Sequence, residues 1–241
     1  MGRLKLWSLA LLLAAPPVLA ADAPGGDAAV ALAQKLIAYR SVTGPGNQAP
    51  EEAAYLKSVL VAGGYDAADV EVVPMAGTAY LVARYRGSDP TAKPIVISGH
   101  MDVVEAKAED WTRDPFTGNV DKGYLFGRGA TDMKGGLAAI VAAMGALAEA
   151  DLAGRVEFVC TADEEAGGLG AREYVAARGN GADVVGCIVT EPTGLRAVHA
   201  GRGTANIDVT ITGKAAHSGR PQDGCSAIAV AGQVLSVIAD D

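Results

Sequence analysis

A histidine and several acids follow apolar segments of this sequence, where side chains can bind metal or transfer protons. His100 and Asp102 form an H-x-D pair after the apolar run 95–97. A histidine that binds metal through one ring nitrogen commonly donates its other N–H to a carboxylate, so the pair suits a metal ligand and its partner. By itself the pair is weak evidence, because H-x-D also occurs in surface turns.

The acids Asp132, Glu164, Glu165 and Glu191 stand beside apolar segments instead of on a charged helical face. Converging carboxylates repel one another unless a cation neutralises them. One histidine nitrogen with several carboxylate oxygens suits Zn²⁺, and a bridging carboxylate suits two metal ions about 3.5–4 Å apart. In the alternative interpretation, Glu164 and Glu165 lie in an exposed turn and Asp132 caps a helix.

The segments that must position these residues alternate between helical and strand patterns, which predicts an α/β layer architecture with a mostly parallel sheet flanked by helices. The carboxyl ends of parallel strands share one edge, so we expect the histidine and the acids to gather there. The expected helices are 28–39, 51–61 and 136–150, the last opened by Asp132, and the expected strands are 70–73, 80–85, 95–97, 156–161 and 184–189.

The pattern changes at about residue 201. Residues 205–211 alternate like a strand with one exposed face, 213–221 form a polar loop, and 226–238 are helical in pattern. We therefore expect one domain over residues 21–200 and the beginning of a second, α+β domain over residues 201–241.

The N-terminal residues 1–20 have the layout of a signal peptide. Basic residues precede the apolar stretch Leu6–Ala15, and small residues precede Ala21. The apolar stretch is shorter than the roughly 20 residues of a membrane span. We expect cleavage near Ala21 and export to the periplasm or the medium, without a membrane anchor.

Composition excludes several classes of protein. The formal net charge of −8 argues against nucleic acid and anionic membranes as partners. An odd count of 3 cysteines does not indicate a disulfide framework. A G-x-S-x-G elbow is absent, which argues against an α/β serine hydrolase. Gly127-Arg-Gly129 and Gly201-Arg-Gly203 lack the third glycine of a dinucleotide loop.

Several segments together resemble the motifs of the M20 metallopeptidase family, in the same order and spacing. This family includes acetylornithine deacetylase, succinyl-diaminopimelate desuccinylase, aminoacylase-1 and glutamate carboxypeptidase. The resemblance covers the chain from about residue 28 to its end. Its motifs are Ser98–Asp102, Gly127–Gly135, Asp163–Glu165 and Thr190–Pro192.

The resemblance implies a catalytic site with two zinc ions, for which Co²⁺ is an alternative. His100 and Glu191 would hold one ion, Glu165 would help to hold the other, and Asp132 would bridge both. These residue types agree with the nitrogen and oxygen ligands that zinc accepts.

The resemblance also implies roles for residues that do not bind metal. Asp102 would orient the histidine ligand. Glu164 would be the general base, taking a proton from water and returning it to the leaving nitrogen. His217 lies in a segment that resembles the start of the family's lid or dimerisation domain, and it would help to stabilise the oxyanion; without the resemblance it reads as an ordinary loop histidine.

In the family, a final histidine ligand comes from a segment after the lid, and no histidine follows His217. The resemblance therefore implies an inactive N-terminal part of a longer protein, which could form a homodimer through its lids. Glutamate at position 191 favours N-acyl amino acid deacylation, whereas export favours scavenging of short peptides, so both substrates stay open. The alternative from another class is a non-catalytic metal- or ligand-binding protein.

Overall fold

The computed structural model of this chain describes residues 25–179, 183–201, 203 and 207–239. The predicted signal peptide lies outside these residues. The chain divides into two compact units, Met1–Arg196 and Ala197–Asp241, and each is described by itself. The assignment of residues 201–241 to a lid domain stays a prediction.

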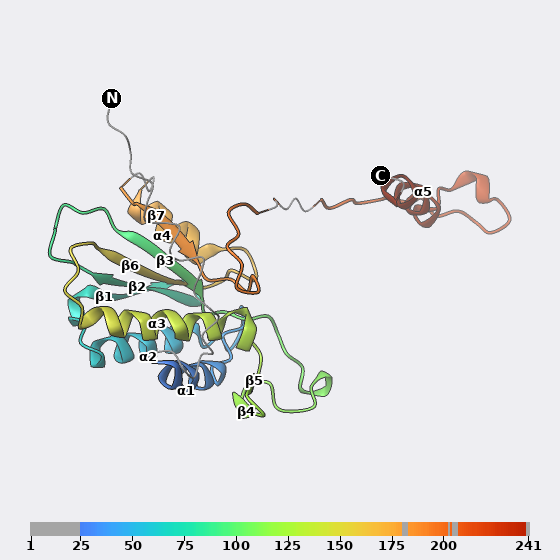
Figure 1. Cartoon of the computed structure of the whole chain (residues 1–241). Helices are drawn as coiled ribbons and strands as arrows, with labels where there is room; N and C mark the ends of the chain where they lie inside the picture. Colours follow the sequence, from blue (N-terminus) through green and yellow to red (C-terminus); the bar gives the residue numbers. More distant parts are fainter. Residues whose placement is uncertain (1–24, 180–182, 202, 204–206, 240–241) are drawn as a thin grey trace. The chain divides into compact units, whose positions relative to one another are not determined.

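Within the described residues, the first unit contains a mixed sheet of five strands in the order β1-β2-β6-β3-β7 (Figure 1). β3 pairs in parallel with both β6 and β7, whereas β2 pairs antiparallel with β1 and β6. The predicted α/β architecture is confirmed, and the parallel strands are those that precede the predicted site. The strands are β1 Val70–Met75, β2 Thr78–Tyr85, β3 Ile95–His100, β6 Val156–Thr161 and β7 Gly186–Val189, and a separate hairpin holds β4 Asn119–Asp121 and β5 Tyr124–Phe126.

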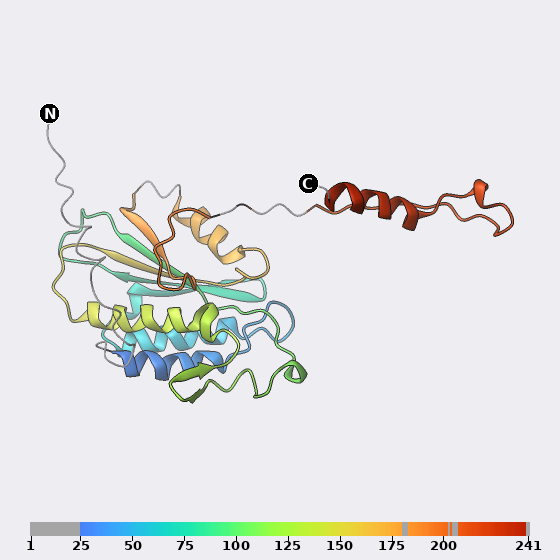
Figure 2. The same ribbon diagram turned by 45° about the vertical axis from the view of Figure 1, so that its right-hand side comes forward.

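Helices cover both faces of this sheet. α1, α2 and α3 lie on one face and α4 on the other (Figures 1 and 2). The first three helices confirm the predicted ones. α4 was not predicted, because its segment lacks the apolar stripe that indicates a helix. In the structure only Gly170 of this helix is buried. The helices are α1 Gly26–Ile37, α2 Ala49–Ala62, α3 Gly135–Ala148 and α4 Leu169–Arg178.

The main core lies between α1–α3 and the sheet. α3 places Leu137, Val141 and Met144 on one face at helical spacing, and they pack in one cluster with Phe158 and Cys160 of β6. Each such buried side chain contributes roughly 1.5–3 kcal/mol. The segment Ala130–Ala148 is apolar and long enough to cross a membrane. Because α3 contributes to this core, we describe it as a core helix.

β7 forms an exposed edge of the sheet. Among the described residues it pairs with β3 alone. Ile188 and Val189 are 54% and 56% exposed. The edge strand that leads to Glu191 is therefore apolar and exposed.

The second unit contains α5, Ala227–Ala239, which confirms the predicted helix. Lys214 and Cys225 form an isolated antiparallel bridge before it. The predicted strand 205–211 is wrong for its described part, since residues 207–211 form no strand. An alternating pattern becomes a strand only where a neighbour accepts its hydrogen bonds, and the described structure offers these residues none.

Candidate metal centre

The three parallel strands bring the predicted site residues to one edge of the sheet. In the sheet register His100 pairs with Thr161 of β6, and Ser98 pairs with Val189 of β7. The pairing continues beyond β7, because the N–H of Thr190 donates to the carbonyl of Ser98 at 3.1 Å. The segments that carry the histidine and the acids thus leave the sheet side by side, as the sequence predicted.

The imidazole of His100 lies at the centre of these acids. Its Nε2 is 3.1 Å from Oδ1 of Asp132, 3.7 Å from Oε1 of Glu191 and 4.0 Å from Oε2 of Glu164. His100 is 1% exposed, whereas the side chains of Asp132 and Glu191 are 51% and 36% exposed. Ligand atoms of His100, Asp132 and Glu191 all lie within 4.8 Å of one another. The fold therefore gathers a group able to hold a metal ion.

Asp102 decides which ring nitrogen faces the acids. Nδ1 of His100 lies 2.9 Å from the main-chain oxygen of Asp102. A carbonyl oxygen only accepts, so Nδ1 carries the hydrogen, and a neutral ring directs the lone pair of Nε2 toward the carboxylates. That contact is favourable only when a proton or a cation lies between the nitrogen and the oxygens.

The charge of His100 responds to this arrangement. Burial is the largest effect and lowers its pKa. The hydrogen bond and charge of Asp102, together with the charge of Glu191, outweigh burial and raise the pKa to about 9. Without a metal, the folded protein therefore holds a proton where a cation would neutralise the acids.

The pKa values of two acids, Glu165 and Glu191, also indicate that the site lacks positive charge. Burial raises the pKa of Glu165 and of Glu191. Repulsion from Asp132 and Glu164 adds to both, and only the charge of His100 opposes it. A divalent cation would relieve this repulsion.

Asp132 does not open α3 as predicted. It lies in a π-helical turn, η4 Ala130–Lys134, with non-helical angles (φ −120°, ψ 99°), and its peptide bond to Met133 is cis. α3 begins at Gly135. In the described structure the carboxylate makes no capping hydrogen bond and contacts Nε2 of His100 instead. The turn was not predicted, because helical periodicity does not reveal where a helix winds differently.

The group does not include Glu165, and His217 is described within the second unit alone. The carboxylate of Glu165 is outside the atoms that lie within 4.8 Å of one another, although its backbone N–H donates to Oδ2 of Asp102 at 3.0 Å. His217 belongs to the second unit, where its Nδ1 accepts the N–H of Gly219 at 3.1 Å. The roles of both residues stay predictions.

Sequence reasoning missed the buried side chains behind Asp132. The ammonium of Lys134 donates to Oε2 of Glu52 at 2.9 Å, and both side chains are 0% exposed. Burial raises the pKa of Glu52 to about 7, although Lys134 opposes it, and burial lowers the pKa of Lys134. The available signal was a lysine between apolar residues, but its partner is 82 positions away.

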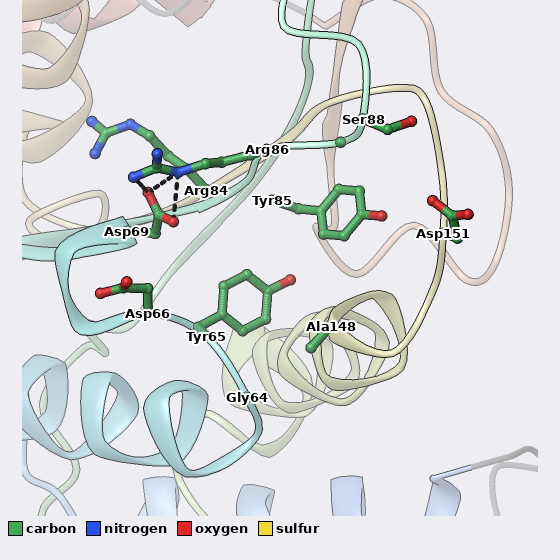
Figure 3. A pocket seen from close by; sticks show the side chains of 11 residues that line it. Gly64, Tyr65, Asp66, Asp69, Arg84, Tyr85, Arg86, Ser88, Ala148 and Asp151 are labelled. Atoms are coloured by element: carbon green, nitrogen blue, oxygen red, sulfur yellow. Dashed lines mark hydrogen bonds and ion pairs between the residues drawn. The ribbon is translucent and has the colours of Figure 1, made fainter.

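A separate cavity of about 320 Å³ (Figure 3) lies near the start of β6, at the end of the parallel strands away from the acids. Tyr85, which lines it, pairs with Val156 at the start of β6, whereas the acids lie beyond the end of β6. In this cavity the guanidinium of Arg86 binds both carboxylate oxygens of Asp69 at 2.7–2.8 Å. These charges neutralise each other, and the cavity is not part of the candidate metal centre.

More than half of the chain matches a family of known proteins. Residues 96–231 match Peptidase family M20/M25/M40, a stretch that begins in β3 and includes every acid of the site. The chain belongs to this peptidase family.

Individual relatives agree with this assignment. The chain is 41% identical over 181 residues to a probable succinyl-diaminopimelate desuccinylase of Staphylococcus epidermidis, covering 74% of this chain and 43% of the relative. It is 44% identical over 137 residues to the one of Staphylococcus aureus, covering 56% and 34%. The chain thus spans less than half the length of these relatives.

Solved structures share the fold. Human carnosine dipeptidase 1 is 28% identical with a TM-score of 0.58, covering 68% of this chain and 38% of that one. A tripeptidase of Staphylococcus aureus is 24% identical with a TM-score of 0.60, covering 86% and 55%. The second likeness supports the fold alone.

Proposed function

We propose that this M20 protein is a zinc-dependent amide hydrolase with His100, Asp132, Glu165 and Glu191 as metal ligands. The observation that carries the proposal is the position of His100 Nε2, which faces carboxylate oxygens of Asp132 and Glu191 at 3.1 and 3.7 Å. The hydrogen bond from Nδ1 to Asp102 is the contact expected behind a metal-binding histidine.

The spacing of these atoms fits a zinc ion. Two nitrogen or oxygen ligands at 2.0–2.2 Å in a tetrahedral shell lie about 3.4 Å apart. The two distances from His100 Nε2 fall on either side of that value. A second zinc ion, bridged by Asp132 and held by Glu165, is part of the proposal, as is the use of Co²⁺ in its place.

The chemistry needs a base beside the ligands. A bound divalent cation polarises a carbonyl and lowers the pKa of water. The position of Glu164 supports its role as general base. Its Oε2 lies 4.0 Å from His100 Nε2, and its side chain is 53% exposed, so water can reach the carboxylate. It would take a proton from the attacking water and return it to the leaving nitrogen.

For the substrate we propose an N-acyl amino acid, with a succinyl group as the first to test. The relatives of 41–44% identity are named as desuccinylases, whereas the dipeptidase is 28% identical. A short peptide is the second candidate. Export through the N-terminal signal, a lid that supplies His217, and pairing of two chains through it remain further proposals.

A non-catalytic metal-binding protein is the alternative function. Two measurements separate the two functions. The first is a zinc titration of the chain. The second is an assay of the product of the complete reading frame for hydrolysis of N-succinyl amino acids, N-acetyl amino acids and dipeptides. Zinc uptake with hydrolysis supports the proposal. Zinc uptake with no hydrolysis of any amide supports the alternative, and failure to take up zinc contradicts both.

A further inference from the structure

Lys134 is a buried cation inside the turn that carries Asp132. Its ammonium donates to the carbonyls of Leu36 at 2.7 Å and Tyr39 at 2.9 Å, and to Oε2 of Glu52 at 2.9 Å. The carbonyl of Leu36 belongs to the last turn of α1, and Tyr39 follows that helix, where a positive charge is favourable. One side chain therefore joins η4 to α1 and α2.

The rest of the turn is fixed equally closely. The N–H of Lys134 donates to the carbonyl of Gly129 at 2.8 Å. Met133 is fully buried, and its sulfur accepts the N–H of His100 at 3.2 Å. A Cβ on Gly99 would lie 2.7 Å from Met133 Cε, so the glycine permits this contact.

The side chain of Asp132 itself makes few contacts. Its side chain is 51% exposed, and the described structure gives it one side-chain hydrogen bond, to His100. Its position follows from the buried residues that come next in the chain. Among these buried residues, Lys134 makes side-chain hydrogen bonds to two other helices, α1 and α2.

Stability alone does not account for a buried ion pair. Removing two charges from water costs several kcal/mol per ion, and apolar residues of similar volume are often as stabilising. In the described structure Oε1 of Glu52 even lacks a hydrogen-bond partner. Directional bonds contribute what apolar packing cannot, namely a fixed orientation of the turn.

We propose that Lys134 is a positioning residue whose bonds to the end of α1 and to Glu52 hold η4 so that Asp132 meets His100. This inference rests on the proposed function, because the expected consequence of correct positioning is tight binding of the zinc ion that Asp132 would help to hold.

The test compares zinc affinity in full-chain variants by calorimetric titration with Zn²⁺, alongside thermal unfolding. Lys134→Met with Glu52→Leu replaces the pair by apolar side chains, so it should fold with a melting temperature near that of the wild type. Its zinc affinity should fall about 10–100-fold, as on loss of a residue that orients a ligand. Glu52→Gln keeps an acceptor for Lys134 and should change the affinity less than threefold.

A matched control is the ion pair between Arg178 of α4 and Glu157 of β6, joined at 2.7 Å with side chains 14% and 6% exposed. Arg178→Met with Glu157→Leu should leave zinc affinity unchanged, whatever it does to stability. If the Lys134 double variant does not fold, Lys134→Met alone at pH 6 replaces it, since burial keeps Glu52 largely neutral there. Wild-type zinc affinity in a folded Lys134 variant would overturn the inference.

A metal-free crystal structure separates this inference from the proposed function. If the wild type binds no zinc, the proposed function fails, but the positioning role is still decided. Loss of the 3.1 Å contact between Asp132 Oδ1 and His100 Nε2 in the variant supports it, and an unchanged contact contradicts it.

Discussion

The backbone N–H of Glu165 donates to Oδ2 of Asp102 at 3.0 Å, which ties the loop after β6 to the loop after β3. The main-chain oxygen of Asp102 also binds Nδ1 of His100. One buried residue therefore contacts both the histidine and the loop that carries Glu164.

Asp102→Ala should lower zinc affinity about 10–100-fold, because it frees the loop of Glu165 and removes the charge beside His100. Asp102→Asn keeps an oxygen that can accept from Glu165, so its loss should be smaller. Zinc titration of both variants checks the order. Equal affinities in the two variants and the wild type would show that the carboxylate of Asp102 does not contribute to zinc binding.

Glu164→Gln should retain bound zinc while kcat falls by about 10²–10⁴-fold, the usual loss on removal of a general base. The amide has the same shape but does not take up a proton from water. Elemental analysis and steady-state hydrolysis by the complete gene product give the two readouts. Near-normal turnover would remove Glu164 from this role.

Asp132→Asn should lower zinc occupancy without unfolding the protein. Its carboxylate contacts His100 and makes no capping bond in the described structure, so the amide removes a ligand charge and not a helix cap. Elemental analysis after dialysis and circular dichroism measure the two properties. Unchanged zinc content together with a lower helix content would indicate a cap instead.

The stability of the metal-free protein should depend on the charge of His100. Its pKa is about 9 in the folded protein, above the ordinary value of 6.5. The folded state therefore binds the proton more tightly, and this contribution is complete below about pH 6.5 and is lost as pH rises through 9. It amounts to at most about 3–4 kcal/mol.

Urea unfolding of the wild type and of His100→Gln, both treated with chelator, measures this contribution. The difference between their free energies of unfolding should shrink from pH 6.5 to pH 9. A constant difference across this range would mean that folding does not raise the pKa of His100.

Gly170→Ala should destabilise the protein by about 1–3 kcal/mol, because an added Cβ would lie 2.8 Å from the backbone nitrogen and oxygen of Ala162. This contact packs α4 against the loop that leads to Glu164. Gly145→Ala is the control, since a Cβ there meets nothing within 4 Å and its helix should gain up to about 1 kcal/mol. Urea unfolding compares the two substitutions, and equal effects would contradict the packing argument.

The sequence by itself determined which residue types follow the carboxyl ends of the parallel strands. Apolar runs followed by His100, Glu164 and Glu191 were readable because strand periodicity and its ends are local properties of the chain. The family motifs in order then identified the family, which the comparison over residues 96–231 confirms.

Only the tertiary structure decided the contacts that orient these residues. The π-helical turn around Asp132 and the bonds of Lys134 to Glu52 and to the end of α1 depend on chain segments up to 98 residues apart. The strand expected at 207–211 failed for a related reason, since a strand requires a partner that no local pattern specifies. Local periodicity fixes which way side chains face, whereas hydrogen bonds between distant segments exist only once the chain has folded.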